Sequence, residues 1–244
     1  MSEDGKWVTI RGHRVFIKDK DVSNYMNNKI RSVMKYNDSS FKYLPEDDDK
    51  AYDKYVEMSE ESYNNMSKDD VDYINNHYVK QNESDDFNEA LRKNMQVDEK
   101  LKKAMDNACN SYTSKENMAG TRFVTFDYLR SEYKLNIERY GDVDRSKIAE
   151  QMKKYIGSDI TSKAYTSISL NESGNGMFGN MGVKLKINMP KGTKMYVADN
   201  VGEYEAILGR NTRMVLKKID FKKSKIQGFE NEYGKVLLTY EVVE

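Results

Sequence analysis

Two pairs of polar residues in the C-terminal half of the chain have types and a spacing that could do chemistry. Ser167 and Ser169 are separated by one residue, and so are Glu203 and Glu205. Side chains alternate between the two faces of a strand, so each pair is expected to share one face. Hydroxyls can fix a carboxylate, and of two neighbouring carboxylates one can stabilise positive charge while the other positions a nucleophile. Each pair taken alone is also compatible with an ordinary polar strand edge.

A third candidate is Arg122, which begins the strand-like run 122–126. Its planar guanidinium is suited to paired hydrogen bonds with a diphosphate. The structural alternative is an arginine that forms a salt bridge at a strand end. The two histidines argue against a multi-histidine metal site. Cys109 lies beside an amphipathic helical stripe and is expected to be a packed thiol rather than a nucleophile.

The composition excludes several functional classes. The 244 residues have a formal net charge of zero, which gives no general attraction to nucleic acid. No apolar run approaches the roughly 18 residues that a membrane-spanning helix needs. Residues 1–6 lack the apolar region of a secretory signal. We therefore expect neither a membrane partner nor a nucleic-acid partner, and a location in the cytoplasm.

The hydrophobic pattern divides the chain into a helical part and a β part. Residues 1–45 are expected to form an N-terminal extension, with a candidate linker over residues 37–49. A period of 3.6 predicts helices across residues 50–110, and a period of 2 after Gly120 predicts mostly strands. Helices first and strands later favour an α+β fold. We expect residues 46–244 to form one domain, whose helices pack on a two-sheet, mixed or antiparallel β core around a cleft.

The N-terminal extension has its own signals. The runs 7–10 and 15–17 predict a hairpin, and the spacing over residues 22–34 predicts a helix. Residues 6–19 resemble a short segment of some phage head-morphogenesis proteins. That resemblance suggests a bacteriophage or prophage origin and an association with virions, which implies a location in the cytoplasm of a host cell or on a virion.

Arg122, Ser167 and Glu205 occur in the order of the Arg–Ser–Glu signature of the mono-ADP-ribosyltransferase exoenzyme family, which includes the enzymatic components of clostridial binary toxins. The resemblance extends to whole segments. Residues 164–170 are similar to the family pattern Gly-Phe-x-Ser-Thr-Ser-Leu, although Ile168 replaces its threonine and Phe123 stands where many members have glycine or arginine. Other segments resemble the family's Pro-Lys-Gly turn, its Glu-x-Glu strand and its helix ending in Leu-Arg: residues 185–194, 203–210 and 87–92.

The resemblance implies an ADP-ribosyltransferase fold, with NAD⁺ as co-substrate in the cleft and no metal. It implies that Arg122 holds the phosphates of NAD⁺, that Phe178 stacks near the nicotinamide, and that Ser169 also belongs to the NAD⁺ site. It further implies a catalytic role for Ser167, which would hydrogen-bond the carboxylate of Glu205. That carboxylate would stabilise the ribosyl cation that forms when nicotinamide leaves.

Glu203 is implied to bind the acceptor as a third catalytic residue, because glutamate at this position accompanies arginine acceptors in the family. The predicted function is therefore a mono-ADP-ribosyltransferase that moves ADP-ribose from NAD⁺ to an arginine of a target protein and releases nicotinamide. An NAD⁺ glycohydrolase, or a transferase acting on another acceptor such as nucleic acid, stays open. An alternative of a different class is a non-enzymatic phage virion or interaction protein on a degenerate transferase fold.

Overall fold

The chain folds into two compact units, residues Met1–Asn37 and Asp38–Glu244. In the smaller unit, strands β1 (Gly5–Ile10) and β2 (His13–Lys18) pair antiparallel, so the predicted hairpin is confirmed. The helix predicted over residues 22–34 lies outside the described residues. The computed structural model describes residues 5–10, 13–18, 36–46, 48–79, 84–137, 144–174, 182–200, 202–224 and 233–243.

Residues 38–46 are part of the larger unit and do not form the free linker expected over residues 37–49. Leu44 is buried, and its N–H donates to the carbonyl oxygen of Leu170 at 2.8 Å. Lys42 forms a parallel bridge with Met118. The segment therefore adds main-chain hydrogen bonds to the β core, and the compact units divide after Asn37 rather than after residue 45.

The helices predicted over residues 50–110 are present, and side-chain caps explain where several of them begin. Asp48, Ser67 and Asp98 each accept a hydrogen bond from a main-chain N–H in the first turn that follows. The amphipathic stripe that includes Leu101 and Met105 is buried, as its spacing predicts. The elements are α2 (Asp49–Asn64), α3 (Lys68–Ile74), the π-helix η1 (Asn75–Val79), α4 (Ser84–Arg92) and α5 (Glu99–Ala108).

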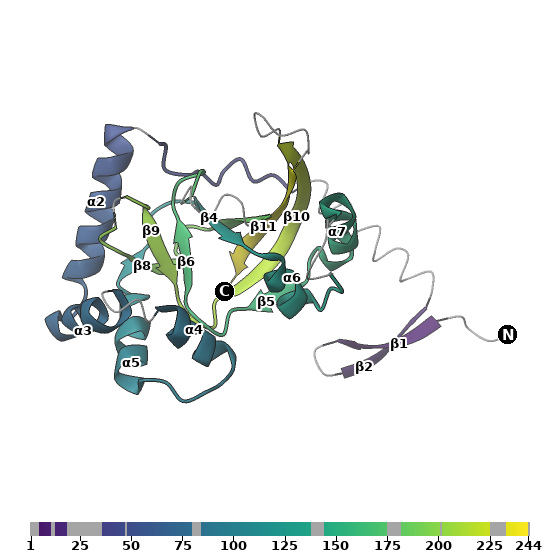
Figure 1. The fold of residues 1–244 in the computed structure, drawn as a ribbon, viewed down its shortest axis with the longest axis horizontal. Coiled ribbons are helices and arrows are strands. Elements are labelled where there is room, and N and C mark those ends of the chain that lie inside the picture. Colours follow the sequence, from purple (N-terminus) through teal and green to yellow (C-terminus); the bar gives the residue numbers. More distant parts are fainter. Residues whose placement is uncertain are drawn as a thin grey trace. The chain divides into compact units, whose positions relative to one another are not determined.

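Nine strands of the described chain form a single mixed sheet in the order β3-β8-β9-β6-β4-β7-β11-β10-β5 (Figure 1). Each neighbouring pair is antiparallel except β7 and β11, which are parallel. The strands are β3 (Tyr112–Thr113), β4 (Met118–Val124), β5 (Asp159–Thr161), β6 (Thr166–Ser169), β7 (Val183–Met189), β8 (Lys194–Val197), β9 (Glu205–Leu208), β10 (Arg213–Ser224) and β11 (Tyr233–Val243).

The α+β fold is confirmed, but the expected division of the core into two sheets is wrong. Two halves of the sheet meet between β4 and β6, where the described register contains one residue pair, Thr121 opposite Ser169. On its other edge, β4 pairs with β7 along its whole length. The alternation of residues along each strand does not reveal a junction made by one residue pair. The sequence therefore suggests two separate sheets where the structure has one.

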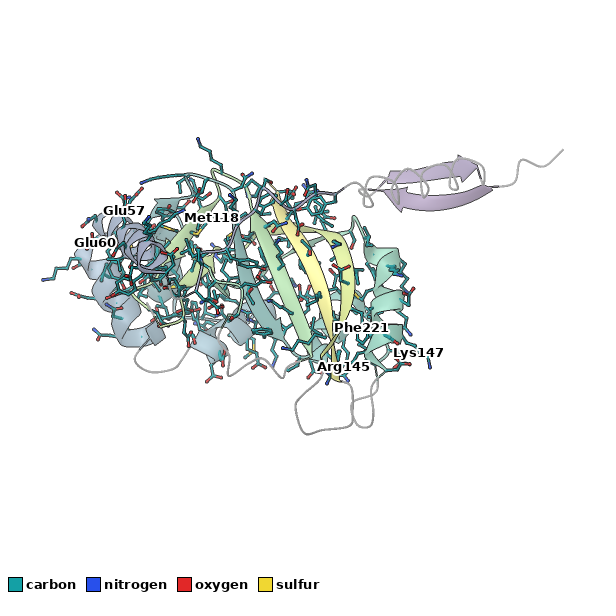
Figure 2. The ribbon with its side chains drawn as sticks, turned by 90° about the horizontal axis from the view of Figure 1, so that it is seen from above. Glu57, Glu60, Met118, Arg145, Lys147 and Phe221 are labelled. Atoms are coloured by element: carbon teal, nitrogen blue, oxygen red, sulfur yellow. The ribbon has the colours of Figure 1, made fainter. Side chains whose placement is uncertain are left out.

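The helices cover the two ends of this sheet. Helices α2 to α5 gather beside β6, β8 and β9, whereas α6 (Phe126–Tyr133) and α7 (Arg145–Met152), with the short 3₁₀-helix η2 (Lys153–Tyr155), lie beside β5 and β10 (Figure 1). Figure 2 shows Glu57 and Glu60 of α2 at one end of the larger unit and Arg145 and Lys147 of α7 at the other. None of the described helices has the length and apolar character needed to cross a membrane.

Two hydrophobic clusters stabilise the larger unit. One lies around the sheet and includes Tyr55, Ile187 and Tyr240, and the other joins α3, α4 and α5 to the strand ends and includes Met105. Cys109 belongs to the second cluster, is buried, and has a thiol pKa raised by that burial. This environment is that of a packed thiol, as its place in the sequence predicts.

Gly120 gives a test of packing at the joint between the half-sheets. A Cβ at this position would lie 2.6 Å from Cδ1 of Ile168, so we expect Gly120→Ala to lower the free energy of unfolding by about 1–3 kcal/mol. Ile168→Val removes that δ-methyl group and should recover part of the loss in the double variant. Urea unfolding measures both effects. Strictly additive losses from the two substitutions would contradict the proposed clash.

Candidate active site

The carboxylate of Glu205 is held at the beginning of β9 by a hydroxyl from β6. Glu205 lies opposite Ser169 in the antiparallel pair, so Ser167 is its diagonal neighbour on the same face. The Oγ of Ser167 donates a hydrogen bond to Oε1 of Glu205 at 2.5 Å. The structure therefore brings together the serine and the glutamate that the sequence places 38 residues apart.

A second side chain contacts the other oxygen of this carboxylate. Nδ2 of Asn200 donates to Oε2 of Glu205 at 3.4 Å, a long hydrogen bond. Both oxygens thus have a neutral donor, and the two donors come from different elements. Such an arrangement orients a carboxylate and leaves its negative charge available to stabilise a nearby positive centre.

Glu203 is held differently from Glu205, and the expectation that both share one strand face is wrong. Residues 202–204 form a turn, and β9 begins only at Glu205. Tyr204 has a φ of 49°, in the left-handed region, which interrupts the alternation of side chains. Its ring packs edge-on against Tyr55, with centroids 5.1 Å apart.

Ser169 supports this turn through the main chain. It is buried, and its Oγ donates to the carbonyl oxygen of Glu203 at 2.6 Å. The N–H of Glu203 donates to the carbonyl oxygen of Asn200 at 3.1 Å. In this structure the second serine of the Ser-x-Ser pair thus fixes the backbone that carries Glu203.

Tyr55 of α2 is a site residue that the sequence analysis missed. Its hydroxyl lies 2.5 Å from the carbonyl oxygen of Ala198, 2.9 Å from that of Glu205 and 3.3 Å from that of Asn200. Burial raises the pKa of Tyr55, so the hydroxyl keeps its proton and can donate it to one of these oxygens. A tyrosine within the hydrophobic stripe of a helix is usually interpreted as a core residue. The sequence signal for a further role was its hydroxyl, because a buried hydroxyl needs a hydrogen-bond partner.

Arg122 bridges the two halves of the sheet next to this site. Beyond the pair of Thr121 and Ser169, the strands β4 and β6 no longer share a ladder, and Nη1 of Arg122 donates to the carbonyl oxygen of Ser167 at 2.6 Å. The guanidinium thus supplies a hydrogen bond where the ladder stops. Burial lowers the pKa of Arg122 and the charge of Arg92 lowers it further, yet a guanidinium stays ionised.

Arg92 and Tyr78 are further residues near the site that the sequence analysis did not assign. Arg92 is the exposed last residue of α4, close enough to Arg122 for their charges to interact. Burial raises the pKa of Tyr78, on the π-helix η1, to about 12, and the charges of Glu205 and Arg122 also act on it. Arg92 ends the Leu-Arg motif, which was the available signal for it.

Five of the six sequence-predicted site residues thus lie in one hydrogen-bonded cluster, in which Arg122 contacts Ser167, Ser167 contacts Glu205 and Ser169 contacts Glu203. Phe178 lies outside the described residues, so its predicted contact with nicotinamide stays a prediction. Among the described residues, no three His, Cys, Asp or Glu side chains form a group that could hold a metal ion.

Comparison with known proteins places these features in context. The family model "ADP-ribosyltransferase exoenzyme" matches residues 50–242. No curated protein matches the sequence.

Solved structures of ADP-ribosylating toxins are similar in fold. Plx2a from Paenibacillus larvae has a TM-score of 0.65 at 16% identity, covering 80% of this chain and 96% of the toxin chain. The C3 exoenzyme of Clostridium limosum has a TM-score of 0.65 at 16% identity, covering 84% and 98%. The enzymatic component C2-I of the Clostridium botulinum C2 toxin has a TM-score of 0.66 at 14% identity. The match covers 98% of this chain but only 54% of C2-I, so the chain spans about half the length of that protein.

Tyr55→Phe tests whether the α2 hydroxyl holds the turn that carries both glutamates. Removal of the hydroxyl leaves buried carbonyl oxygens with fewer partners and should cost about 1–3 kcal/mol of folding free energy. We also expect faster hydrogen exchange at the N–H groups of Ala198 and Glu203, whose bonds close this turn.

Tyr63→Phe is the matched control, because Tyr63 lies on the same helix and accepts a hydrogen bond from Tyr196 instead. It should lower stability without a local effect on residues 198–205. Equal exchange rates in the Tyr55→Phe variant and the parent protein would show that the hydroxyl does not hold the turn.

Proposed function

Because the chain belongs to the ADP-ribosyltransferase exoenzyme family, we propose that it transfers ADP-ribose from NAD⁺ to an arginine side chain of a target protein. The observation that carries this proposal is the Glu205 carboxylate, oriented by Ser167 and Asn200 beside a turn that presents a second glutamate. In such a transfer, one carboxylate can stabilise the charge on the sugar and another can pair with the guanidinium of the acceptor. Glu205 and Glu203 supply these two groups.

The donor is NAD⁺, the substrate of ADP-ribosyltransferases. Its diphosphate carries two negative charges, and Arg122 and Arg92 bring two guanidinium groups to the same region. One Nη of Arg122 is occupied by the carbonyl oxygen of Ser167, and its remaining N–H groups can serve the diphosphate. The residues present therefore fit an anionic dinucleotide, and Arg122 would join the donor to the strand that carries Ser167.

Glu205 acts on bond cleavage. The bond between ribose C1′ and the nicotinamide nitrogen breaks, and its electron pair stays with the nitrogen, so nicotinamide leaves as a neutral molecule. The ribose acquires oxocarbenium character, and the carboxylate held by Ser167 stabilises that positive charge. Because folding already orients the carboxylate, it does not have to reorganise during the reaction. Because the leaving group is neutral, no strong general acid is needed.

Glu203 acts on the acceptor. A carboxylate pairs with a guanidinium by charge-assisted hydrogen bonds, which orients one of its nitrogens toward C1′. As the new bond from that nitrogen to C1′ forms, the nitrogen's proton passes to the Glu203 carboxylate. Ser169 and Asn200 hold the main chain of Glu203, so the turn can keep this carboxylate at a fixed distance from Glu205.

Two substitutions separate these roles. Glu205→Gln keeps the shape of the side chain but loses its charge, so both NAD⁺ hydrolysis and arginine modification should fall by roughly 100-fold or more. Glu203→Gln should abolish modification of agmatine, an arginine analogue, and largely spare hydrolysis. Nicotinamide release with and without agmatine measures both reactions.

Glu116→Gln is the control, because Glu116 is exposed and pairs with Lys54 on the surface. Full activity of Glu205→Gln would overturn the proposed function. Equal losses of hydrolysis and transfer in Glu203→Gln would contradict the division of roles. A parent protein that only hydrolyses NAD⁺ is a glycohydrolase, and one that releases no nicotinamide is not an enzyme of this class.

A further inference from the structure

Tyr52 is an exposed aromatic residue on α2, outside the hydrogen-bonded cluster of the candidate active site. Among the described residues, Tyr52 and Met95 are the two large hydrophobic side chains that are exposed, to 47% and 60% respectively. A single exposed hydrophobic residue is common on protein surfaces, so its surroundings decide whether it has a role. The place of Tyr52 follows from the contacts that its helix makes with the strands.

The contacts of α2 follow the chain from β8 into the turn that carries Glu203. Near the end of the helix, the hydroxyl of Tyr63 accepts a hydrogen bond from β8. One turn earlier, the Oγ of Ser59 donates to the carbonyl oxygen that directly follows β8, at 3.3 Å. One turn earlier again, the hydroxyl of Tyr55 lies 3.3 Å from the carbonyl oxygen of Asn200. Toward its beginning, the helix therefore approaches the turn, and Figure 1 shows it beside β8 and β9.

Tyr52 continues this line of contacts by one more turn of the helix. Residues seven apart lie on the same helix face, so Tyr52 shares the face of Ser59. Tyr52 also precedes Tyr55 by three residues, which makes the two side chains neighbours. Because the previous contacts reach Asn200, the next turn of the helix brings Tyr52 beside the residues that follow Asn200, which form the turn of Glu203. An exposed aromatic ring thus lies next to the carboxylate that is proposed to bind the acceptor.

The surface around Tyr52 is acidic. Asp49, Asp53 and Glu60 are exposed and lie on one stripe of α2, because four and seven residues separate them. This stripe runs beside that of Tyr52, and Figure 2 shows Glu60 at the end of the larger unit. The turn adds the exposed carboxylate of Asp199. The negative charge therefore extends from the turn along the outer side of the helix.

The fold itself does not account for this acidic face. A carboxylate in the first turn of a helix, such as that of Asp49, stabilises the helix dipole, but Asp53 and Glu60 lie beyond the first turn. Lys54 of the same helix does not neutralise them, because it pairs with Glu116 instead. An exposed aromatic ring with carboxylates beside it is typical of a surface that contacts a basic partner.

We propose that the face of α2 around Tyr52 is a docking surface for the acceptor protein, and that it selects arginines with basic neighbours. The ring of Tyr52 packs against the acceptor, where a guanidinium or ammonium group fits over it. Asp49, Asp53 and Glu60 attract a basic surface and repel an acidic one, so they determine which acceptor binds. The inference rests on the proposed function, because it requires that Glu203 receives an arginine.

Arginine acceptors with different neighbours test this surface. Agmatine offers a guanidinium without neighbouring side chains, whereas a peptide of about fifteen residues with a central arginine extends roughly 23 Å on either side. That reach exceeds the rise of about 17 Å along α2 between Asp49 and Glu60. One peptide carries lysines around the arginine and a second carries glutamates. In the parent protein, kcat/KM should be about 100-fold higher for the lysine peptide, and added salt should reduce this preference.

Tyr52→Ala separates docking from chemistry. It should raise KM for the lysine peptide about tenfold at unchanged kcat, the loss expected when one aromatic contact is removed. Modification of agmatine and hydrolysis of NAD⁺ should stay within about twofold of the parent values. Tyr52→Phe keeps the ring and should retain the low KM. Met95→Ala is the control, because it removes the other exposed hydrophobic side chain, which follows α4.

A triple variant tests the carboxylates. Asp49→Asn, Asp53→Asn and Glu60→Gln keep the shapes of the side chains and remove their charges, so the preference for the lysine peptide should fall about tenfold. The matched control removes three exposed carboxylates from α6 and α7, at the other end of the sheet: Asp127→Asn, Glu132→Gln and Glu150→Gln. This control should keep the preference of the parent protein.

The outcomes separate this inference from the proposed function. A parent protein that modifies neither agmatine nor the peptides contradicts the proposed function itself. A parent protein that modifies agmatine but does not prefer the lysine peptide overturns the docking surface, and so do equal losses with agmatine and peptide in Tyr52→Ala. A parent protein that sediments as a dimer, which Tyr52→Ala dissociates, would show that a second copy of the chain occupies this face and would overturn the inference too.

Discussion

The separation of β4 from β6 after one residue pair is the constraint on which this site depends. Beyond Thr121 and Ser169 the two half-sheets have no shared ladder, and the guanidinium of Arg122 reaches the carbonyl oxygen of Ser167 instead. A joint of this kind leaves main-chain groups of both strands to be satisfied by side chains. It also puts a permanent positive charge next to the serine that orients Glu205, so the same feature that joins the half-sheets supplies a binding group for an anionic donor.

The two glutamates differ in how the fold supports them, and this difference fits two separate roles. Glu205 belongs to a strand, and its carboxylate is held directly by side chains. Glu203 belongs to a turn, and the structure holds its main chain through Ser169 and through the turn that Tyr55 braces. A carboxylate that stabilises charge on a bound ribose benefits from a fixed position. A carboxylate that pairs with side chains of another protein is suited to a turn.

Hydrophobic periodicity predicts much of the fold, but it does not predict the contacts that individual polar atoms make between elements. The stripe of α5 and the strand β7 are predicted because a whole face of each is buried. The contact of Ser167 with Glu205 is predictable from the Arg–Ser–Glu order, and the register explains it as a diagonal pair. By contrast, the amide nitrogen of Asn200 and the hydroxyl of Tyr55 are single polar atoms that reach another part of the fold, and such contacts leave no periodic signal. The turn at Glu203 escaped prediction because alternation assumes a continuous strand, and the left-handed Tyr204 ends that continuity.

The chemical identity of the modified side chain tests the account most directly. The protein would be incubated with NAD⁺ and a host-cell lysate, and the ADP-ribose would be located on peptides by mass spectrometry with a fragmentation method that preserves the modification. The account predicts ADP-ribose on arginine side chains of one or a few proteins. ADP-ribose on asparagine, glutamine or cysteine, on nucleic acid, or on nothing at all would contradict it.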